Sequence, residues 1–307
     1  MSAKAQLLAL LQLEGLGTEW VRQLIQTFGS PSAIFAADAE SLMEAGVEEK
    51  IAQAIAMADE EAIWSLEIQL MDYEDQSGVR FVPIGAPEYP PNLLEIEAAP
   101  LFLWCQGEIL PQDQRAVAVV GARRASMRGT SNAQRIAMSL AAQEVTVVSG
   151  LALGVDTAAH QGALDAGGRT IAVLGSGIEM IVPEENRGLA TRIARQGAIV
   201  SELLRTDAFP SRQHFFDRNR IITGLSKVVI VVEAEADSGS VDTGLKALEQ
   251  GRELLVVVPE QGLPPGNEQL LGMGGVPVSS VNEIFEALGE LRVRRAAEEQ
   301  LRDLRGR

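Results

Sequence analysis

The sequence contains little of what several classes of protein require. Its 307 residues include one cysteine, Cys105, and two histidines, at positions 160 and 214. One cysteine cannot form an intramolecular disulfide or a cysteine-based metal site, and two distant histidines do not suggest a zinc site, so we expect neither metal nor cofactor. No run of about 18 apolar residues is present, and the N-terminus lacks the pattern of a signal peptide. These absences predict a cytoplasmic protein that does not enter a membrane.

Basic residues are scarce in the first third of the chain. Residues 1–114 contain 4 Lys and Arg but 19 Asp and Glu, whereas residues 115–260 contain 16 of each kind. The net charge of −16 therefore belongs almost entirely to the first third, where it argues against attraction of nucleic acid. The middle segment is neutral, and its arginines cluster in two short stretches, GARRASMRG and RQHFFDRNR. A local site for an anion is compatible with this distribution.

The pattern of apolar residues divides the chain. Residues 1–75 show helical spacing, and in TEWVRQLIQTFGS we expect Thr18 to cap a helix that stops at Gly29. The stretch LEGLGTEWVRQLIQTFGS is similar to a helix-hairpin-helix, whose turn can bind a DNA phosphate. The alternative is a small helical bundle used for protein contacts, which the acidic charge favours. Residues 76–114 are expected to form a connector with the first strands, and residues 289–307 a charged helix or tail.

From residue 115 onwards, apolar strands alternate with segments long enough for crossover helices. The expected strands are AVAVVG, VTVVSG, TIAVLGSG, AIVSE, KVVIVVEA and ELLVVVP. Continuous runs of Val and Ile are typical of strands that are buried on both faces. Residues 115–288 are therefore predicted to form an α/β domain with a doubly wound, mostly parallel sheet of the Rossmann-like type. Ligands of such sheets bind outside the carboxyl ends of the strands.

Glycine-rich segments follow four of these strands, in GARRASMRG, GLALGVDTAAH, GSGIEMIVPEENR and EADSGSVDTG. Glycine lets a ligand approach the backbone, and a following helix offers unpaired N–H groups to an anion. None of the four is a G-x-G-x-x-G or Walker A motif, so neither a dinucleotide nor a triphosphate is specifically indicated. Together they predict an anion site that includes Gly121, Arg123, Arg124, Arg128, Ser149, Gly150, Gly175, Gly177, Ser238, Gly239 and Ser240.

The stretch RQHFFDRNRIITGLS precedes the strand KVVIVVEA and permits two interpretations. It is either a structural corner, or a site for an anion that carries flat rings, such as a nucleotide or a nucleic acid strand. In the second interpretation Arg218 and Arg220 contact phosphates, and Asn219 holds the loop. Of the adjacent Phe215 and Phe216, one is expected to point into the core and one outward, where it can stack on a base.

Other polar residues near these loops are expected to have structural roles. His160 and Asp156 follow SGLALG on the same expected helix, and we interpret the histidine as structural and the aspartate as a cap or brace. The adjacent Glu184 and Glu185 are expected to face solvent. Cys105, within PLFLWCQG, is expected to be a buried small hydrophobe.

The order and spacing of these blocks resemble the DprA/Smf (DNA processing protein A) family over about residues 80–285. The most specific blocks are GARRASMRG, VVSGLALGVDTAAHQGAL, HFFDRNRIITGLSKVVIVVEA and SGSVDTGLKALEQGRELLVVVP. The resemblance implies a SAM-like N-terminal domain, homodimers, binding of single-stranded DNA and loading of the RecA recombinase, notably in natural transformation, with no enzymatic activity. It also implies a positively charged DNA pocket that includes Arg123, Arg218 and Arg220. Val182 stands where the family commonly has an aromatic residue, which affects the expected shape of that pocket.

Two other functions stay open at this point. The same type of sheet edge occurs in the LOG-type phosphoribohydrolases, which process nucleotides, but their PGGxGT loop is missing and ADSGSVDTG stands in its place. Glu233 and Glu202 are the only obvious candidates for general acid–base chemistry. An interaction protein that has lost DNA binding is the other alternative, because the first third of the chain is so acidic.

Overall fold

The structure, a computed structural model, describes residues 2–203 and 210–289. The expected C-terminal helix or tail, residues 289–307, lies outside this range except for its first residue. The chain divides into two compact units, Met1–Tyr89 with Pro100–Gln106, and Pro90–Ala99 with Gly107–Arg307. The first unit thus extends beyond residue 75, because two strands of the expected connector belong to it.

Six helices form most of the first unit, and their spacing in sequence leaves only short turns between them. Helix α2 begins at Thr18, so Gly17 rather than Thr18 is its N-cap residue, and the expected side-chain cap is absent there. The helix ends as predicted at Gly29, whose φ of 87° is the left-handed conformation that favours glycine. The helices are α1 (Ala3–Gln12), α2 (Thr18–Phe28), α3 (Pro31–Ala36), α4 (Ala39–Glu44), α5 (Glu49–Ala56) and α6 (Glu60–Ser77).

An antiparallel pair of strands, β1 (Val79–Pro83) and β2 (Phe102–Gly107), completes this unit. Its inner face is aromatic: the ring of Phe81 lies 4.9 Å from the rings of both Phe102 and Trp104, measured between centroids. Such contacts stabilise a small core beyond the apolar area that they bury. Cys105 is fully buried in β2, as expected.

The second unit contains a parallel sheet whose strands occur in the order β6-β5-β4-β3-β7-β8-β9. Six of these strands coincide with the predicted apolar runs. The edge strand β9 was not predicted, because it is short and contains Pro277, which a central strand would exclude. The strands are β3 (Val117–Val120), β4 (Val147–Ser149), β5 (Thr170–Val173), β6 (Ala198–Ser201), β7 (Val228–Val231), β8 (Glu253–Val257) and β9 (Val276–Val278).

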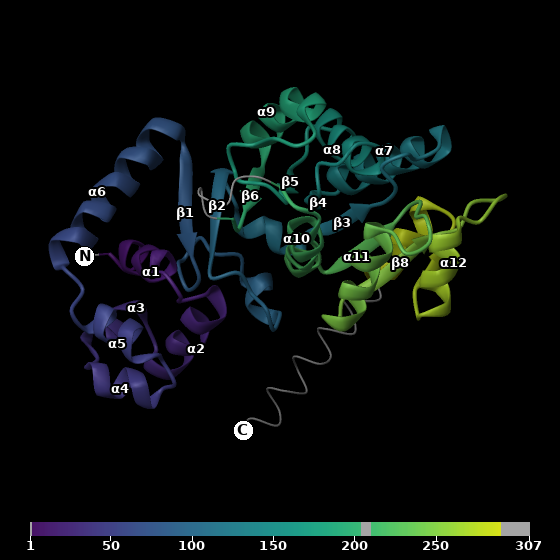
Figure 1. Cartoon of the computed structure of the whole chain (residues 1–307). Coiled ribbons are helices and arrows are strands. Elements are labelled where there is room, and N and C mark those ends of the chain that lie inside the picture. Colours follow the sequence, from purple (N-terminus) through teal and green to yellow (C-terminus); the bar gives the residue numbers. More distant parts are fainter. Residues whose placement is uncertain (1, 204–209, 290–307) are drawn as a thin grey trace, which may run out of the picture. The chain divides into compact units, whose positions relative to one another are not determined.

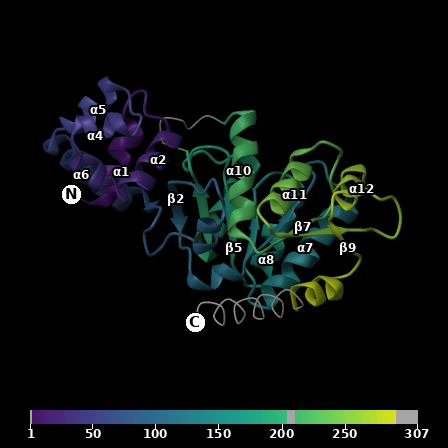
Figure 2. The same ribbon diagram turned by 90° about the horizontal axis from the view of Figure 1, so that it is seen from below.

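Helices cover both faces of this sheet, so the predicted doubly wound α/β class is confirmed. Figure 1 shows α7, α8 and α9 along one side of the sheet, and Figure 2 shows α10 and α11 next to each other. Buried apolar side chains of α7 and α8 pack against β3, β7 and β8 in one continuous core. The helices are α7 (Met127–Ala142), α8 (Val155–Asp165), α9 (Arg187–Gln196), α10 (Arg212–Leu225), α11 (Gly239–Glu249) and α12 (Pro265–Gly272), with short 3-10 turns at Pro91–Glu95, Pro111–Arg115 and Glu184–Asn186.

The strand order determines where a ligand can bind. From β3 the chain continues to β4 on one side, whereas β7 joins β3 on the other side. The loops that leave β3, β4 and β7 therefore diverge at their carboxyl ends and leave a crevice between them. Within the described part of the chain, no helix combines the length and the apolar character needed to cross a bilayer.

Candidate functional site

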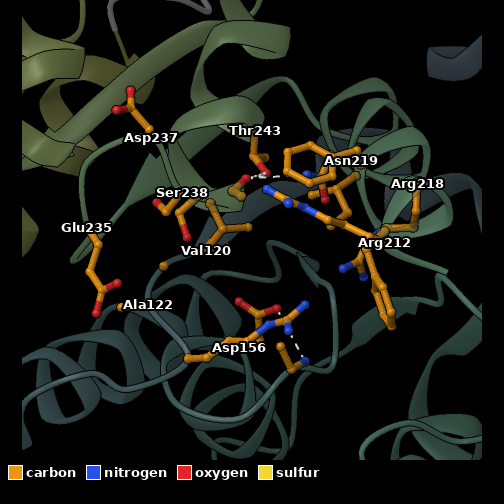
Figure 3. A pocket seen from close by; sticks show the side chains of 18 of the residues that line it. Val120, Ala122, Asp156, Arg212, Arg218, Asn219, Glu235, Asp237, Ser238 and Thr243 are labelled. Carbon is orange, nitrogen blue, oxygen red and sulfur yellow. Dashed lines mark hydrogen bonds between the residues drawn. The ribbon is translucent and has the colours of Figure 1, made fainter. Parts of the chain in front are cut away.

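A cavity of about 660 Å³ opens at the carboxyl ends of β3, β4 and β7 (Figure 3). Four segments line it: the loop after β3, the loop that enters α8, the first turns of α10, and the segment from residue 235 into α11. All four belong to the second unit. The cavity thus occupies the crevice that the strand order creates, at the edge where the sequence predicted an anion site.

A buried arginine forms the floor of this cavity. Arg218 lies on α10 and is 6 % exposed, and its Nη1 donates hydrogen bonds to the carbonyl oxygens of Gly150, at 2.8 Å, and Val173. A Cβ atom at position 150 would lie 2.3 Å from that same Nη1, so any other residue there would displace the guanidinium. The Nε atom is buried without a hydrogen-bond partner among the described residues. Arg218 therefore links the ends of β4 and β5 and still has unused donor capacity.

Asp156 compensates part of this buried charge. It lies in the first turn of α8, where its Oδ2 accepts hydrogen bonds from the backbone N–H groups of Gly150 and Ala152, at 3.2 and 3.3 Å. Burial raises the pKa of Asp156, and the positive charge of Arg218 acts in the opposite direction. Burial also lowers the pKa of Arg218 to about 10, an effect that Asp156 opposes and Arg123 reinforces. Arg218 thus stays a cation at neutral pH. Asp156, which was expected to cap or brace its own helix, instead braces the loop that precedes this helix.

Further arginines surround the cavity. Arg123 and Arg124 come from the loop after β3, and Arg212 comes from the first turn of α10. The guanidinium of Arg123 lies 5.3 Å from the ring centroid of Phe215, and that of Arg212 lies 5.5 Å from that of Phe216. None of the three arginines forms an ion pair with an acidic residue in the described ranges. Their charges are therefore available to an anion.

Both phenylalanines of the HFFDRNR block line the cavity, which corrects the expectation that one points inward and one outward. The block is helical, and adjacent residues of a helix lie about 100° apart, so both can reach one opening. Phe215 packs against Gly175, where an added Cβ would lie 2.6 Å from its ring. It also lies next to two arginines, since the guanidinium of Arg218 is 6.0 Å from the same ring. Phe216 has fewer such neighbours and is the better placed of the two to contact a ligand.

The amino end of α11 forms another part of the wall. Ser238 is the N-cap residue, but its hydroxyl makes no cap bond and is buried without a hydrogen-bond partner among the described residues. Asn219 holds this segment from α10, because its Nδ2 donates to the Gly239 carbonyl at 3.3 Å and to Asp242 Oδ2 at 2.9 Å. An uncapped helix of this length presents backbone N–H groups and a positive dipole end to an anion.

Ten of the predicted site residues line the cavity. They are Gly121, Arg123, Arg124, Phe215, Phe216, Arg218, Asn219, Ser238, Gly239 and Ser240.

Arg220 and Arg128 are not brought to this cavity. Arg220 forms a two-pronged ion pair with Glu202, in which Nη1–Oε1 is 2.6 Å and Nη2–Oε2 is 2.5 Å. Arg128 lies in the first turn of α7 and donates to the Gln261 carbonyl at 3.2 Å. The sequence could not separate these arginines from their neighbours, because the partners that occupy them are distant along the chain.

Four other predicted residues shape the site from behind rather than line it. Ser149 is fully buried and donates its hydroxyl to the Val119 carbonyl at 2.7 Å. Gly150 contacts Arg218 and Gly175 contacts Phe215, as described above. Gly177 is buried in the turn that follows, where its carbonyl accepts from the N–H of Met180 at 2.9 Å.

Two acidic residues at the cavity were not predicted. Glu235 and Asp237 line it from the segment after β7, and Figure 3 shows them on one side of the opening with Arg212 on the other. Arg212 was noticed in the sequence as part of a basic cluster but was not assigned to the site. The stretch EADSGSVDTG contained both carboxylates, but sequence position alone does not show which of its side chains face a cavity.

The remaining polar residues behave as structural groups. His160 is fully buried, and its Nδ1 lies 2.6 Å from Thr170 Oγ1. Burial and the charge of Arg218 lower the pKa of His160 to about 3, so the ring is neutral. Glu184 and Glu185 are exposed, as predicted. Glu233 does not line the cavity, because its carboxylate accepts from the N–H and the hydroxyl of Ser126, at 2.9 and 2.6 Å.

The family model described as DNA recombination-mediator protein A matches residues 80–289. The chain belongs to this family. The matched residues include all the strands of the second unit and every residue that lines the cavity.

Individual proteins are also similar to the chain in sequence. The chain is 40% identical to protein Smf of Escherichia coli over 217 residues, which are 70% of the chain and 58% of that protein. It is 36% identical to DNA processing protein DprA of Bacillus subtilis over 228 residues, which are 73% and 76% of the two chains. The match thus spans little more than half of the E. coli relative.

Solved structures of this DNA recombination-mediator family also resemble the chain. DNA processing protein A of Streptococcus pneumoniae superposes with a TM-score of 0.71 at 29% identity, covering 93% of this chain and 98% of that one. DNA processing protein A of Helicobacter pylori gives a TM-score of 0.62 at 28% identity, covering 68% and 96%. The structure of the H. pylori protein was described for its single-stranded DNA binding mode.

Proposed function

We propose that the chain binds single-stranded DNA in the cavity at the carboxyl edge of the sheet and loads the RecA recombinase onto that DNA. In this proposal it acts as a homodimer in the cytoplasm, as in natural transformation, and has no catalytic turnover. The family assignment and the DNA-binding relative from H. pylori support the proposal. The residues described above support it independently.

The observation that carries the proposal is a buried, charged arginine beneath arginines that have no acidic partner. Arg218 keeps its charge at 6 % exposure, although burial of a cation is unfavourable and Asp156 compensates only part of this charge. Above it, Arg123, Arg124 and Arg212 line the same cavity without a partner among the described acids. Phosphate groups are anions that arginine binds well, through two parallel hydrogen bonds.

The shape of the cavity favours a single strand over a duplex. Its volume of about 660 Å³ lies within the range of small-ligand sites, about 300–1,000 Å³. A flexible single strand can place a nucleotide in such a cavity, whereas a base-paired nucleotide would first have to unpair and unstack. Phe216 offers a ring for a base, and stacking of this kind depends little on base identity.

Fluorescence anisotropy with labelled single-stranded and duplex oligonucleotides across a salt series tests the DNA part. We expect tighter binding to the single strand, little sequence preference, and an affinity that falls as salt rises. Equal or stronger binding to the duplex would contradict the proposal.

The recombinase part requires a separate assay. We expect the chain to accelerate RecA filament assembly on single-stranded DNA, and sedimentation to show a dimer. If the chain binds DNA but does not accelerate RecA filament assembly, it is a DNA-binding protein that does not load the recombinase. The absence of turnover is checked with nucleoside monophosphates: release of base or phosphate that vanishes in Glu233→Gln would favour an enzyme instead.

A further inference from the structure

Helix α6 has two apolar faces, and only one of them is buried. Ile63 and Leu70 are each 5 % exposed and lie within the core of the first unit. In contrast, Trp64, Ile68 and Met71 are 54, 48 and 62 % exposed. We call these three side chains the α6 stripe. A helix that used a single face for folding would carry polar residues at these positions.

The α6 stripe is continuous along the helix. Its residues occur at positions i, i+4 and i+7, which lie above one another on one face. This face differs from the buried one, because positions 63 and 70 lie roughly 80–160° around the helix from the residues of the stripe. Isolated exposed apolar residues are common, but a contiguous stripe that contains a tryptophan is typical of a surface that binds another molecule.

Acidic residues surround the α6 stripe. Glu60, Glu61, Asp72 and Asp75 are all exposed on α6, and no ion pair to any of them occurs among the described residues. By contrast, Glu74 of the same helix pairs with Lys4 at 3.1 Å. The helix contains no Lys or Arg. The stripe is thus an apolar seam with unpaired negative charge on its flanks.

We propose that the α6 stripe docks an amphipathic helix of a partner protein whose apolar seam is flanked by Lys and Arg. Apolar positions at the same helical spacing would pack on Trp64, Ile68 and Met71, and the basic flanks would face the four carboxylates. A second copy of α6 is a poor partner, because its flanks carry the same negative charge. DNA is excluded for the same reason. The proposal concerns the first unit alone and does not depend on the cavity of the second.

A synthetic peptide of 18 residues provides the probe. It carries Leu at i, i+4, i+7 and i+11 with Lys and Arg on both sides, and a fluorescent label for anisotropy. One control peptide has the same composition with the Leu residues distributed around the helix, and another has Glu in place of Lys and Arg. We expect the full-length chain to bind the first peptide and to bind both controls at least about tenfold more weakly.

Variants of the chain locate the binding. Ile68→Ser should weaken the first peptide about tenfold or more, and Asp72→Asn combined with Asp75→Asn should weaken it most at low salt. Met127→Ser is the matched control, because Met127 is 90 % exposed in the second unit and should change nothing. All these positions are exposed, so thermal melts should be unchanged.

Several outcomes would overturn the proposal. If the scrambled peptide binds as tightly as the patterned one, charge alone explains the binding and the apolar pattern plays no part. If Ile68→Ser has no effect, the peptide binds at another surface. Failure of the wild-type chain to bind the patterned peptide would also reject it. If sedimentation instead shows self-association that Ile68→Ser abolishes, the occupant is a second copy. Single-stranded DNA binding should be equal in wild type and Ile68→Ser, which separates this surface from the cavity.

Discussion

Arg220 and Glu202 form a two-pronged ion pair, in which Nη1 donates to Oε1 at 2.6 Å and Nη2 donates to Oε2 at 2.5 Å. Both side chains are mostly shielded from solvent, at 19 and 21 % exposure. The pair ties the second half of α10 to the residue that follows β6, so Arg220 does not present a free cation to a ligand. It therefore distinguishes Arg220 from the arginines of the cavity, although all of them occur in similar basic stretches of sequence.

Arg220→Ala is expected to lower stability and leave the salt dependence of DNA binding unchanged. Removing one partner of a largely buried pair leaves the other charge poorly solvated, and we expect a loss of about 1–3 kcal/mol of unfolding free energy. Urea denaturation measures this loss, and a salt titration with single-stranded DNA measures the slope. Glu202→Gln should destabilise the chain similarly. A stable Arg220→Ala protein with a flattened salt slope would assign Arg220 to the DNA instead.

Arg123→Ala is expected to show the opposite behaviour. Arg123 has no acidic partner among the described residues, so its loss should change the melting temperature little. If it contacts one phosphate, the log–log slope of affinity against salt should decrease by about 0.7, equally for all DNA sequences. An unchanged slope would mean that Arg123 serves only to cover Phe215.

Phe216→Ala is expected to weaken single-stranded DNA binding by about 1–3 kcal/mol if a base stacks on the ring. Phe216→Trp should preserve binding, because tryptophan offers a larger ring. Phe215→Ala is the comparison, and it should also lower the melting temperature, since it empties the space in front of Gly175. Equal affinities for wild type and Phe216→Ala would reject the stacking role.

Glu235→Gln is expected to strengthen DNA binding. Its carboxylate lines the cavity and repels phosphates, so we expect a gain of about twofold to fivefold at low salt that shrinks as salt is added. Asp237→Asn should act in the same direction, and asparagine tolerates the φ of 51° at this position. Glu185→Gln, an exposed acid away from the cavity, is the control. Weaker binding by Glu235→Gln would show that the carboxylate receives a hydrogen bond from the DNA.

His160 should make stability depend on pH. Its pKa is lowered to about 3 in the folded chain from about 6.5 in the unfolded chain, so below pH 6.5 only the unfolded chain gains the proton. Stability should therefore fall by about 2 kcal/mol from this group between pH 7 and pH 5. Asp156, whose pKa is raised, acts with the opposite sign, because its stabilisation is lost as pH rises. Comparing the slopes of unfolding free energy in wild type and His160→Asn isolates the histidine, and parallel curves would contradict the prediction.

The sequence allowed most of the second unit to be predicted, because buried parallel strands are continuous apolar runs such as KVVIVVEA. It did not reveal β9, whose three residues include a proline, or the grouping of β1 and β2 with the helices of the first unit. The glycines were expected to let a ligand approach the backbone, but at Gly121 a Cβ would lie 2.6 Å from Val155, so the close neighbour there is another part of the chain.

Predicting individual charges was harder. A basic stretch shows which cations are near a site, but their partners are set by tertiary contacts across the fold. Arg220 and Glu202 are 18 residues apart, and Arg128 and Gln261 are 133 apart. The carboxylates of Glu235 and Asp237 were missed for the same reason. The sequence thus indicated which residue types occur near the site, but it did not show which charged side chains lack a partner and can bind a ligand.

The link that Arg218 makes between the ends of β4 and β5 has a consequence for genetics. Because this side chain holds the fold together beneath the cavity, its loss would remove the protein along with the binding site. Alleles that separate DNA binding from protein abundance should therefore occur at Arg123, Arg124 or Arg212. A screen that recovers only stably expressed mutants would miss Arg218, although it is a buried charge of the site.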